Sequence, residues 1–203
     1  MVRFDSQPIR WAAILGCSLV LAALGLSVSA RGENGDNDLN PTVTFAPEHS
    51  VGTGDIVYRS ATMLVRTHHY VFATIRTSGL QPGNVYTAWF AIFNNPRYCA
   101  TDPCSAADLS NPDVEGSLVN FGGQLVGPDG TAEYAEVRAV GDATNAQLGP
   151  GLLNSRGAQI HLTVRNHGPA LADPTAFAQQ LTMFNGGCPP NACVTIQAAV
   201  HEP

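Results

Sequence analysis

The chain has 203 residues, with 10 arginines, no lysine, 16 acidic residues and a formal net charge of −6. The absence of lysine excludes Schiff-base catalysis and a P-loop, because both need that amine. An acidic chain also lacks the basic patches that bind nucleic acid or anionic membranes, so no nucleic-acid partner is expected.

The first 30 residues have the features of a secretory signal. Arg3 and Arg10 lie in a polar start, residues 11–26 are almost wholly apolar, and residues 27–30 (Ser-Val-Ser-Ala) place small side chains where a signal peptidase reads them. We therefore expect residues 1–30 to be a signal peptide. The protein is then exported, to the periplasm or the extracellular space.

Two alternatives for this segment remain open. Residues 11–30 are an apolar stretch of about 20 residues, long enough to span a bilayer as an uncleaved anchor, and only then is an integral membrane role expected. Cys17 follows Ile-Leu-Gly, a loose match to the lipidation signal of lipoproteins. Without residues 1–30, eight arginines and 15 acidic residues remain, which makes the formal charge −7.

Residues 31–41 are polar, acidic and rich in glycine and asparagine, which indicates a disordered lead-in. Residues 42–203 are long enough for a single domain with its own core. In this part of the chain apolar residues recur with a period of two, which is typical of strands. Strands are expected at residues 42–46, 56–66, 69–76, 85–93, 118–126, 131–140, 158–166 and 194–201.

Residues 85–93 are apolar on both faces, which predicts a central strand that is covered on both sides. Helix is scarce, with one capped turn at residues 105–108 and a short helix from Asp173 through Gln179. About seven to eight strands with Gly/Pro turns predict an all-β fold, namely a two-sheet antiparallel sandwich. An eight-stranded barrel is the alternative.

Two further patterns bear on the layout of the strands. Residues 127–130 (Gly-Pro-Asp-Gly) predict a hairpin between the strands on either side. Phe-Asn occurs shortly before each of two cysteine-closed loops, at residues 93–94 and 184–185. If this echo marks equivalent strands, both loops lie at one end of the sandwich; chance similarity explains it equally well.

Four cysteines follow the signal segment in two C-x4-C pairs, Cys99 with Cys104 and Cys188 with Cys193. In an exported chain an even number of cysteines predicts disulfides, and we favour the two local pairings among the three connectivities. Closing so short a loop gains only about 2 kcal/mol, so these bonds are expected to rigidify surface loops. A zinc site of four thiolates is the alternative.

The histidines are the feature of the sequence that could carry chemistry. Exported β-sandwiches can bind copper or zinc through imidazoles, and the candidate ligands are His68, His69, His161, His167 and His201. On a straight strand His161 and His167 share a face but lie about 20 Å apart, and Arg165 between them repels a cation. Surface or hydrogen-bonding histidines are therefore the competing interpretation.

No catalytic motif stands beside the histidines. The sequence lacks G-x-S-x-G, H-E-x-x-H, G-x-G-x-x-G and C-x-x-C, and its acidic residues are scattered through expected turns. The sequence therefore favours a protein that is not an enzyme, and no cofactor is predicted.

Several segments resemble a family of uncharacterised exported bacterial proteins. They are Phe-Asn-Asn-Pro at residues 93–96, Ala-Asp-Leu at 107–109, Ile-His-Leu-Thr-Val-Arg-Asn-His-Gly-Pro at 160–169 and Phe-Asn-Gly-Gly-Cys-Pro-Pro-Asn at 184–191. The resemblance extends over most of the chain after the signal segment. It implies a bacterial source and one exported domain, and it assigns no activity and no catalytic residue.

Two functional hypotheses follow. The first is an exported, non-catalytic β-sandwich that serves as a binding or structural module for a protein or cell-surface partner. Its expected binding loops are the cysteine-closed ones, with Asn94, Tyr98, Asp102 and Asn191. The second is a periplasmic or secreted copper- or zinc-binding protein that uses the strand histidines.

Overall fold

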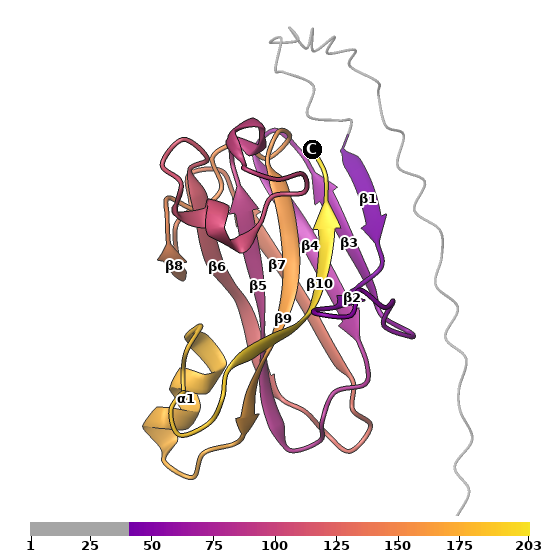
Figure 1. The fold of residues 1–203 in the computed structure, drawn as a ribbon, viewed down its shortest axis with the longest axis vertical. Helices are drawn as coiled ribbons and strands as arrows, with labels where there is room; N and C mark the ends of the chain where they lie inside the picture. Colours follow the sequence, from indigo (N-terminus) through magenta and orange to yellow (C-terminus); the bar gives the residue numbers. More distant parts are fainter. Residues whose placement is uncertain (1–40) are drawn as a thin grey trace, which may run out of the picture. The chain divides into compact units, whose positions relative to one another are not determined.

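The computed structural model describes residues 41–203, which form two antiparallel sheets packed face to face (Figure 1). The four-stranded sheet has the order β1 (Thr42–Ala46), β3 (Ala61–Arg66), β4 (Tyr70–Thr77) and β7 (Ala132–Ala139). The six-stranded sheet has the order β2 (His49–Ser50), β10 (Val194–His201), β9 (Gln159–Pro169), β5 (Asn84–Phe93), β6 (Gly116–Leu125) and β8 (Ala146–Leu148). The predicted sandwich is confirmed, and because each sheet keeps two open edges the fold is not a closed barrel. The expected signal peptide at 1–30, Cys17 and all but the last residue of the lead-in lie outside the described residues.

The core fills the space between the sheets, and strand alternation decides which side chains enter it. Leu64, Ala73 and Ile75 reach it from the four-stranded sheet, and Phe90 and Leu162 from the six-stranded sheet. Apolar side chains on one face of each strand are thereby removed from water, which is the main favourable contribution to folding.

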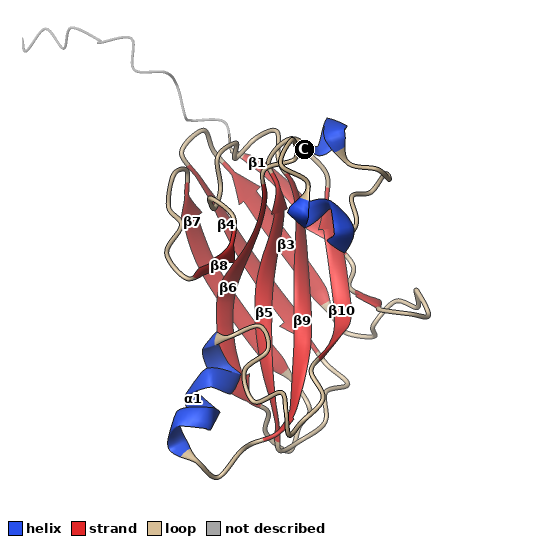
Figure 2. Ribbon diagram, turned by 60° about the vertical axis from the view of Figure 1, so that its left-hand side comes forward, coloured by secondary structure: helices blue, strands red, loops and turns tan. Residues whose placement is uncertain are grey.

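The outer face of the six-stranded sheet is covered at both ends by loop segments (Figure 2). The β5–β6 connection carries the short helices η1 (Pro96–Tyr98) and η2 (Ala106–Ser110), and the β9–β10 connection carries α1 (Pro174–Thr182). This cover explains why β5 is apolar on both faces, as predicted for a central strand. None of these helices is long and apolar enough to cross a membrane.

Both predicted helix starts are confirmed by their caps. The Asp108 carboxylate accepts hydrogen bonds from the backbone N–H and the hydroxyl of Ser105, at 2.7 and 2.8 Å. The Asp173 side chain accepts from the backbone N–H of Ala176 at 2.8 Å, which satisfies one of the free donors of the first turn of α1.

Two expectations about the layout are wrong, namely the hairpin at residues 127–130 and the strand at residues 57–60, and the alternative that sets both cysteine-closed loops at one end does not hold. The turn at residues 127–130 crosses between the sheets, because β6 pairs with β5 and β8 whereas β7 pairs with β4. The two cysteine-closed loops lie at opposite ends of the sandwich, since Phe93 pairs with Gln159 and the other end of β5 pairs with the end of β9. Residues 57–60 form turns rather than a strand, and Ile56 makes only an isolated bridge to His49.

Candidate functional site

The cysteines form the two local disulfides that their spacing predicts. The Cα atoms of Cys99 and Cys104 are 5.3 Å apart, and those of Cys188 and Cys193 are 5.8 Å apart, both within the usual range for disulfides. Because the two pairs lie at opposite ends of the sandwich, they do not meet in a four-thiolate zinc site. Two disulfides in one small domain indicate an oxidising, non-cytoplasmic location.

The histidines do not converge on one metal site. His68 and His69 are exposed in the turn between β3 and β4, whereas His161, His167 and His201 lie in the six-stranded sheet. Among the described residues, the only group of three or more His, Cys, Asp or Glu side chains with ligand atoms within 4.8 Å contains a single histidine, His167.

His201 is a buried link between the two sheets. Its Nε2 lies 2.9 Å from the hydroxyl of Thr62, and that hydroxyl donates to the carbonyl of Ala46, so Nε2 carries the imidazole proton. Its Nδ1 accepts from the hydroxyl of Thr44 at 2.8 Å. Desolvation, with a smaller contribution from the charge of Arg66, lowers the pKa of His201 to about 4. Both nitrogens are therefore occupied in a neutral, structural role.

His161 lies half-buried on the outer face of β9. Its ring is 4.9 Å from that of Phe93, and its Nε2 donates to Oε1 of Gln159 at 3.1 Å. Desolvation lowers the pKa of His161 to about 4. Gln159 Oε1 also accepts from the backbone N–H of Cys104 at 2.7 Å, so this pair fastens the first disulfide loop to the sheet.

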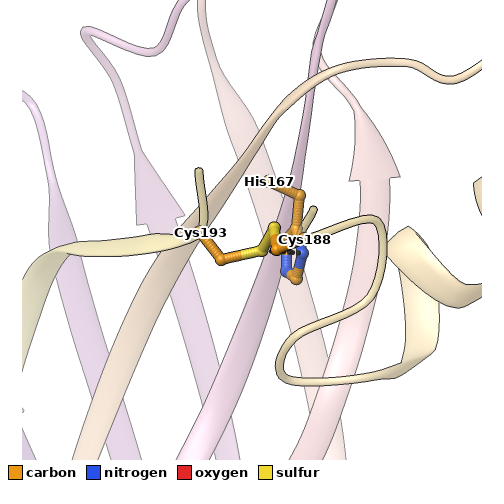
Figure 3. A group of neighbouring side chains, drawn as sticks. All are labelled: His167, Cys188 and Cys193. Atoms are coloured by element: carbon orange, nitrogen blue, oxygen red, sulfur yellow. Dashed lines mark hydrogen bonds between the residues drawn. A yellow bond between two sulfur atoms is a disulfide. The ribbon is translucent and has the colours of Figure 1, made fainter. Parts of the chain in front are cut away.

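His167 lies against the second disulfide at the other end of β9. Its Nδ1 is 3.3 Å from Sγ of Cys193, and Figure 3 shows the imidazole beside the sulfur–sulfur bond to Cys188. We call His167, Cys188 and Cys193 the His167 cluster. The histidine is buried, whereas both cysteines are half-buried and so reachable from solvent.

Two hydrogen bonds fix the orientation and protonation of this imidazole. Nδ1 lies 2.9 Å from the carbonyl of Gly186, which can only accept, so Nδ1 carries the proton. Nε2 therefore accepts from the hydroxyl of Thr87 at 2.7 Å, and Trp89 Nε1 donates to the same hydroxyl oxygen at 2.6 Å. Desolvation is the largest cause that lowers the pKa of His167, so the ring is neutral at physiological pH.

Arg165 places a buried positive charge beside this cluster. Its guanidinium stacks over Phe184, with Cζ 3.9 Å from the ring centroid, and donates to the side chain of Asn185 and to the carbonyl of Cys193 at 3.0 and 3.2 Å. Its other acceptors are the carbonyl of Phe184 and the hydroxyl of Thr195. All of these acceptors are neutral, and within residues 41–203 no carboxylate lies at ion-pair distance from Arg165.

The sequence contains a signal for the His167 cluster in the pairing of its last two predicted strands. β9 and β10 are antiparallel neighbours, and Asn166 pairs with Val194. That register sets His167 beside Cys193. Both strands were predicted, so pairing them as consecutive strands would have brought the histidine to the second cysteine loop.

The four residues expected to form binding loops have divergent roles. Asn94 is buried, donates to the carbonyls of Glu115 and Gly151, and accepts from the backbone of residues 153 and 154. Asn191 donates to two β9 carbonyls, at residues 167 and 169, and so fastens the second disulfide loop. Only Tyr98 and Asp102 are exposed.

An apolar surface that no helix of residues 41–203 covers lies on the opposite side of the sandwich, on the outer face of the four-stranded sheet. One apolar row of facing side chains crosses all four strands, and the next row is Phe45, Met63, Thr74 and Ala135, with one polar member. We call this surface the apolar face; its members are Val43, Phe45, Met63, Val65, Phe72, Ala135 and Val137. Phe45 is 75% and Val137 52% exposed, and the described helices pack against the other sheet.

A hollow of about 560 Å³ lies on the apolar face beside Phe45. The charges at its margin are those of Arg76 and Glu133, which form an exposed ion pair at 3.2 Å. The face as a whole is therefore apolar and close to neutral.

Comparison of the chain with protein-family models, curated proteins and solved structures found no match. The resemblance to a family of exported bacterial proteins stays a prediction.

Proposed function

We propose that this protein is an exported, non-catalytic binding module that associates with a second copy of itself through the apolar face. The observation that carries the proposal is the row Val43, Val65, Phe72 and Val137, which crosses the whole sheet without a covering element among the described residues. Contiguous exposed apolar patches on exported domains mark interaction sites, whereas single exposed apolar side chains do not.

The size of the face fits a dimer interface. The four strands contain 5, 6, 8 and 8 residues, and at about 4.8 Å by 3.4 Å for each residue the whole sheet covers roughly 440 Å² in projection, without the added area of the side-chain relief. A standard interface removes about 800 Å² from each partner. The outer face of the sheet therefore supplies about half of one partner's share without a contribution from loops.

Shape and charge favour a second copy over a charged partner. A twofold axis sets the same patch against itself, so every apolar row meets another apolar row. Phe45 projects beside a hollow. In a twofold pair the Phe45 side chain of each copy enters the hollow of the other copy. The Arg76–Glu133 pair at the margin adds no net charge, whereas the rest of the chain is acidic and repels acidic partners.

Export is part of the proposal and is supported by the signal-like first 30 residues together with the two disulfides. Both features are expected of a protein that matures outside the cytoplasm.

The test compares two matched substitutions in the purified protein by sedimentation velocity over a range of concentrations. Val137→Arg places a charge at the β7 edge of the apolar face, and Leu125→Arg places the same charge on β6 of the other sheet, at a residue of nearly equal exposure, 51% against 52%. We expect the wild-type chain and Leu125→Arg to dimerise alike, and Val137→Arg to weaken dimerisation at least about tenfold because two charges are buried without partners. A wild-type chain that stays monomeric at all concentrations, or equal effects of the two substitutions, would refute the proposal.

A further inference from the structure

The two disulfides differ in what lies beside them, and this difference is independent of the apolar face. Cys104 Sγ has the carbonyl of Pro96 as its polar neighbour, at 3.8 Å, whereas Cys193 Sγ is 3.3 Å from an imidazole nitrogen. A metal bound to one thiolate at about 2.3 Å and one imidazole at about 2.0 Å holds these two atoms about 3.6 Å apart. The Sγ of Cys193 and the Nδ1 of His167 therefore already lie at nearly the separation of two ligands of one metal ion. In the oxidised protein the two sulfurs are bonded to each other instead of to an ion.

We propose that the Cys188–Cys193 disulfide is a reducible lock on a Cu(I) site formed by Cys188, Cys193 and Nδ1 of His167. A dithiol reductant breaks the sulfur–sulfur bond and is itself oxidised to a disulfide. Two electrons and two protons pass from the dithiol to the cysteines. Cu(I) then displaces both thiol protons, and the copper stays monovalent throughout.

The donor set favours Cu(I) among the soft cations. Thiolates are soft ligands that suit Cu(I) and Zn(II), and imidazole, a borderline ligand, also suits copper and zinc. Structural zinc sites are almost always closed by four protein ligands, and among the described residues the cluster contains three. A three-ligand set leaves zinc short of one ligand but suffices for Cu(I).

The charge of Arg165 supports the same choice. Two thiolates with Cu(I) carry a net charge of −1, whereas with Zn(II) they are neutral. The buried guanidinium has only neutral acceptors and donates to the carbonyl of Cys193, within the same loop. A buried cation without an anionic partner is costly, so an anionic complex beside it is favoured. The monovalent ion satisfies this requirement and the divalent ion does not.

The loop is held in place by contacts that do not depend on the disulfide. Asn191 donates to the carbonyls of His167 and Pro169, both at 2.8 Å, and Arg165 binds the backbone of Cys193. A Cβ at Gly186 would lie 1.9 Å from the carbonyl oxygen of Gln179, so the loop packs directly on α1. The ligands therefore stay near one another after reduction, which lowers the cost of assembling the site.

Metal binding at Nδ1 requires the other tautomer of His167. The proton then sits on Nε2 and is donated to Thr87 Oγ1, which also accepts from Trp89 and has two lone pairs for the purpose. Thr87 thus orients the imidazole in both states, which makes it a positioning residue for the site.

The experiment uses the purified protein with its disulfides intact or after reduction by dithiothreitol and anaerobic desalting. Cu(I) is offered as its bicinchoninate complex, and transfer to the protein is followed by loss of the chelate colour. Because reduction also opens Cys99–Cys104, the Cys99→Ser/Cys104→Ser variant isolates the second pair. We expect this variant to take up one Cu(I) per chain when reduced and none when oxidised.

His167→Gln leaves both cysteines in place and is expected to weaken Cu(I) binding at least about tenfold, whereas His161→Gln is expected to leave it within about twofold. Three results would overturn the proposal: no uptake by the reduced Cys99→Ser/Cys104→Ser variant, undiminished uptake when Cys188→Ser and Cys193→Ser are added to that variant, or tighter binding of Zn(II) than of Cu(I). Peptide mapping of each oxidised sample establishes which disulfides are present at the start.

Discussion

Glu48 provides the sharpest test of the energetics of this fold, because it is a carboxyl group buried without adequate partners. It follows β1, is fully buried, and neither of its carboxylate oxygens has a hydrogen bond of ordinary geometry. Desolvation raises the pKa of Glu48 from 4.5 to about 7, although the nearby hydroxyls of Thr77 and Ser60 lower it in part. We predict that Glu48→Gln stabilises the protein at pH 8.

The sign follows from where the proton is bound. Below pH 4.5 the folded and unfolded chains both keep it, so ionisation of Glu48 does not change the free energy of unfolding. Between pH 4.5 and 7 only the unfolded chain releases the proton, and the free energy of unfolding falls as the pH rises. A shift from 4.5 to about 7 corresponds to a total loss of about 3 kcal/mol, which stays constant above pH 7.

Urea denaturation at several pH values between 4.5 and 8, with disulfides intact and tryptophan fluorescence as the signal, measures this loss. His161 and His201 have the opposite sign, since their lowered pKa values make stability rise as the pH increases above about 4. The informative quantity is therefore the difference between Glu48→Gln and wild type. We expect it to grow from near zero at pH 4.5 to about 3 kcal/mol at pH 8. A difference that does not change with pH would refute the reasoning, and Glu133→Gln, at an exposed site, is the control.

Two further predictions concern packing and buried hydrogen bonds, and both are read from urea denaturation at pH 7. Gly123→Ala should cost about 1–3 kcal/mol, because its Cβ would lie 2.3 Å from the carbonyl oxygen of Leu181 and push α1 off the sheet. Gly127→Ala, with only a side-chain atom at 3.5 Å, should stay within about 0.5 kcal/mol, and equal costs would contradict this account. Asn94→Ala should cost about 3 kcal/mol or more, because it strands four backbone groups. Asn95→Ala, at a half-buried site, should cost less than about 1 kcal/mol, and the reverse order would show that the buried hydrogen bonds of Asn94 do not stabilise the fold.

Strand positions were predictable because alternation is a local property of the chain. The last strand is confirmed to the residue at Val194–His201, and the capped helix start at Asp173 is confirmed by its hydrogen bond. The path between strands was less predictable. A Gly-Pro-Asp-Gly turn shows that the chain reverses, but not whether the next strand joins the same sheet or the facing one. Here β6 belongs to the six-stranded sheet and β7 to the four-stranded sheet.

The roles of the histidines were also hard to predict, because they depend on contacts with distant strands. Alternation tells which face of β10 a side chain occupies, and not what meets it across the core. His201 forms hydrogen bonds with hydroxyls on β1 and β3, more than 130 residues earlier in the chain. Both of its ring nitrogens are thereby used in a structural role. His167 differs because its partner is on the neighbouring strand, so its place beside Cys193 could have been derived from strand pairing alone.

The contrast between the two outer faces bears most directly on function. On the six-stranded sheet, long connections closed by disulfides fold back over both ends, and α1 covers β5 and β6. On the four-stranded sheet, in the part of the chain that the structure describes, short connections leave the row from Val43 to Val137 uncovered. An uncovered apolar sheet face with an open edge strand is an aggregation hazard for a protein that stays monomeric. A second copy on this face would remove that hazard, whereas a purely monomeric role leaves it unexplained.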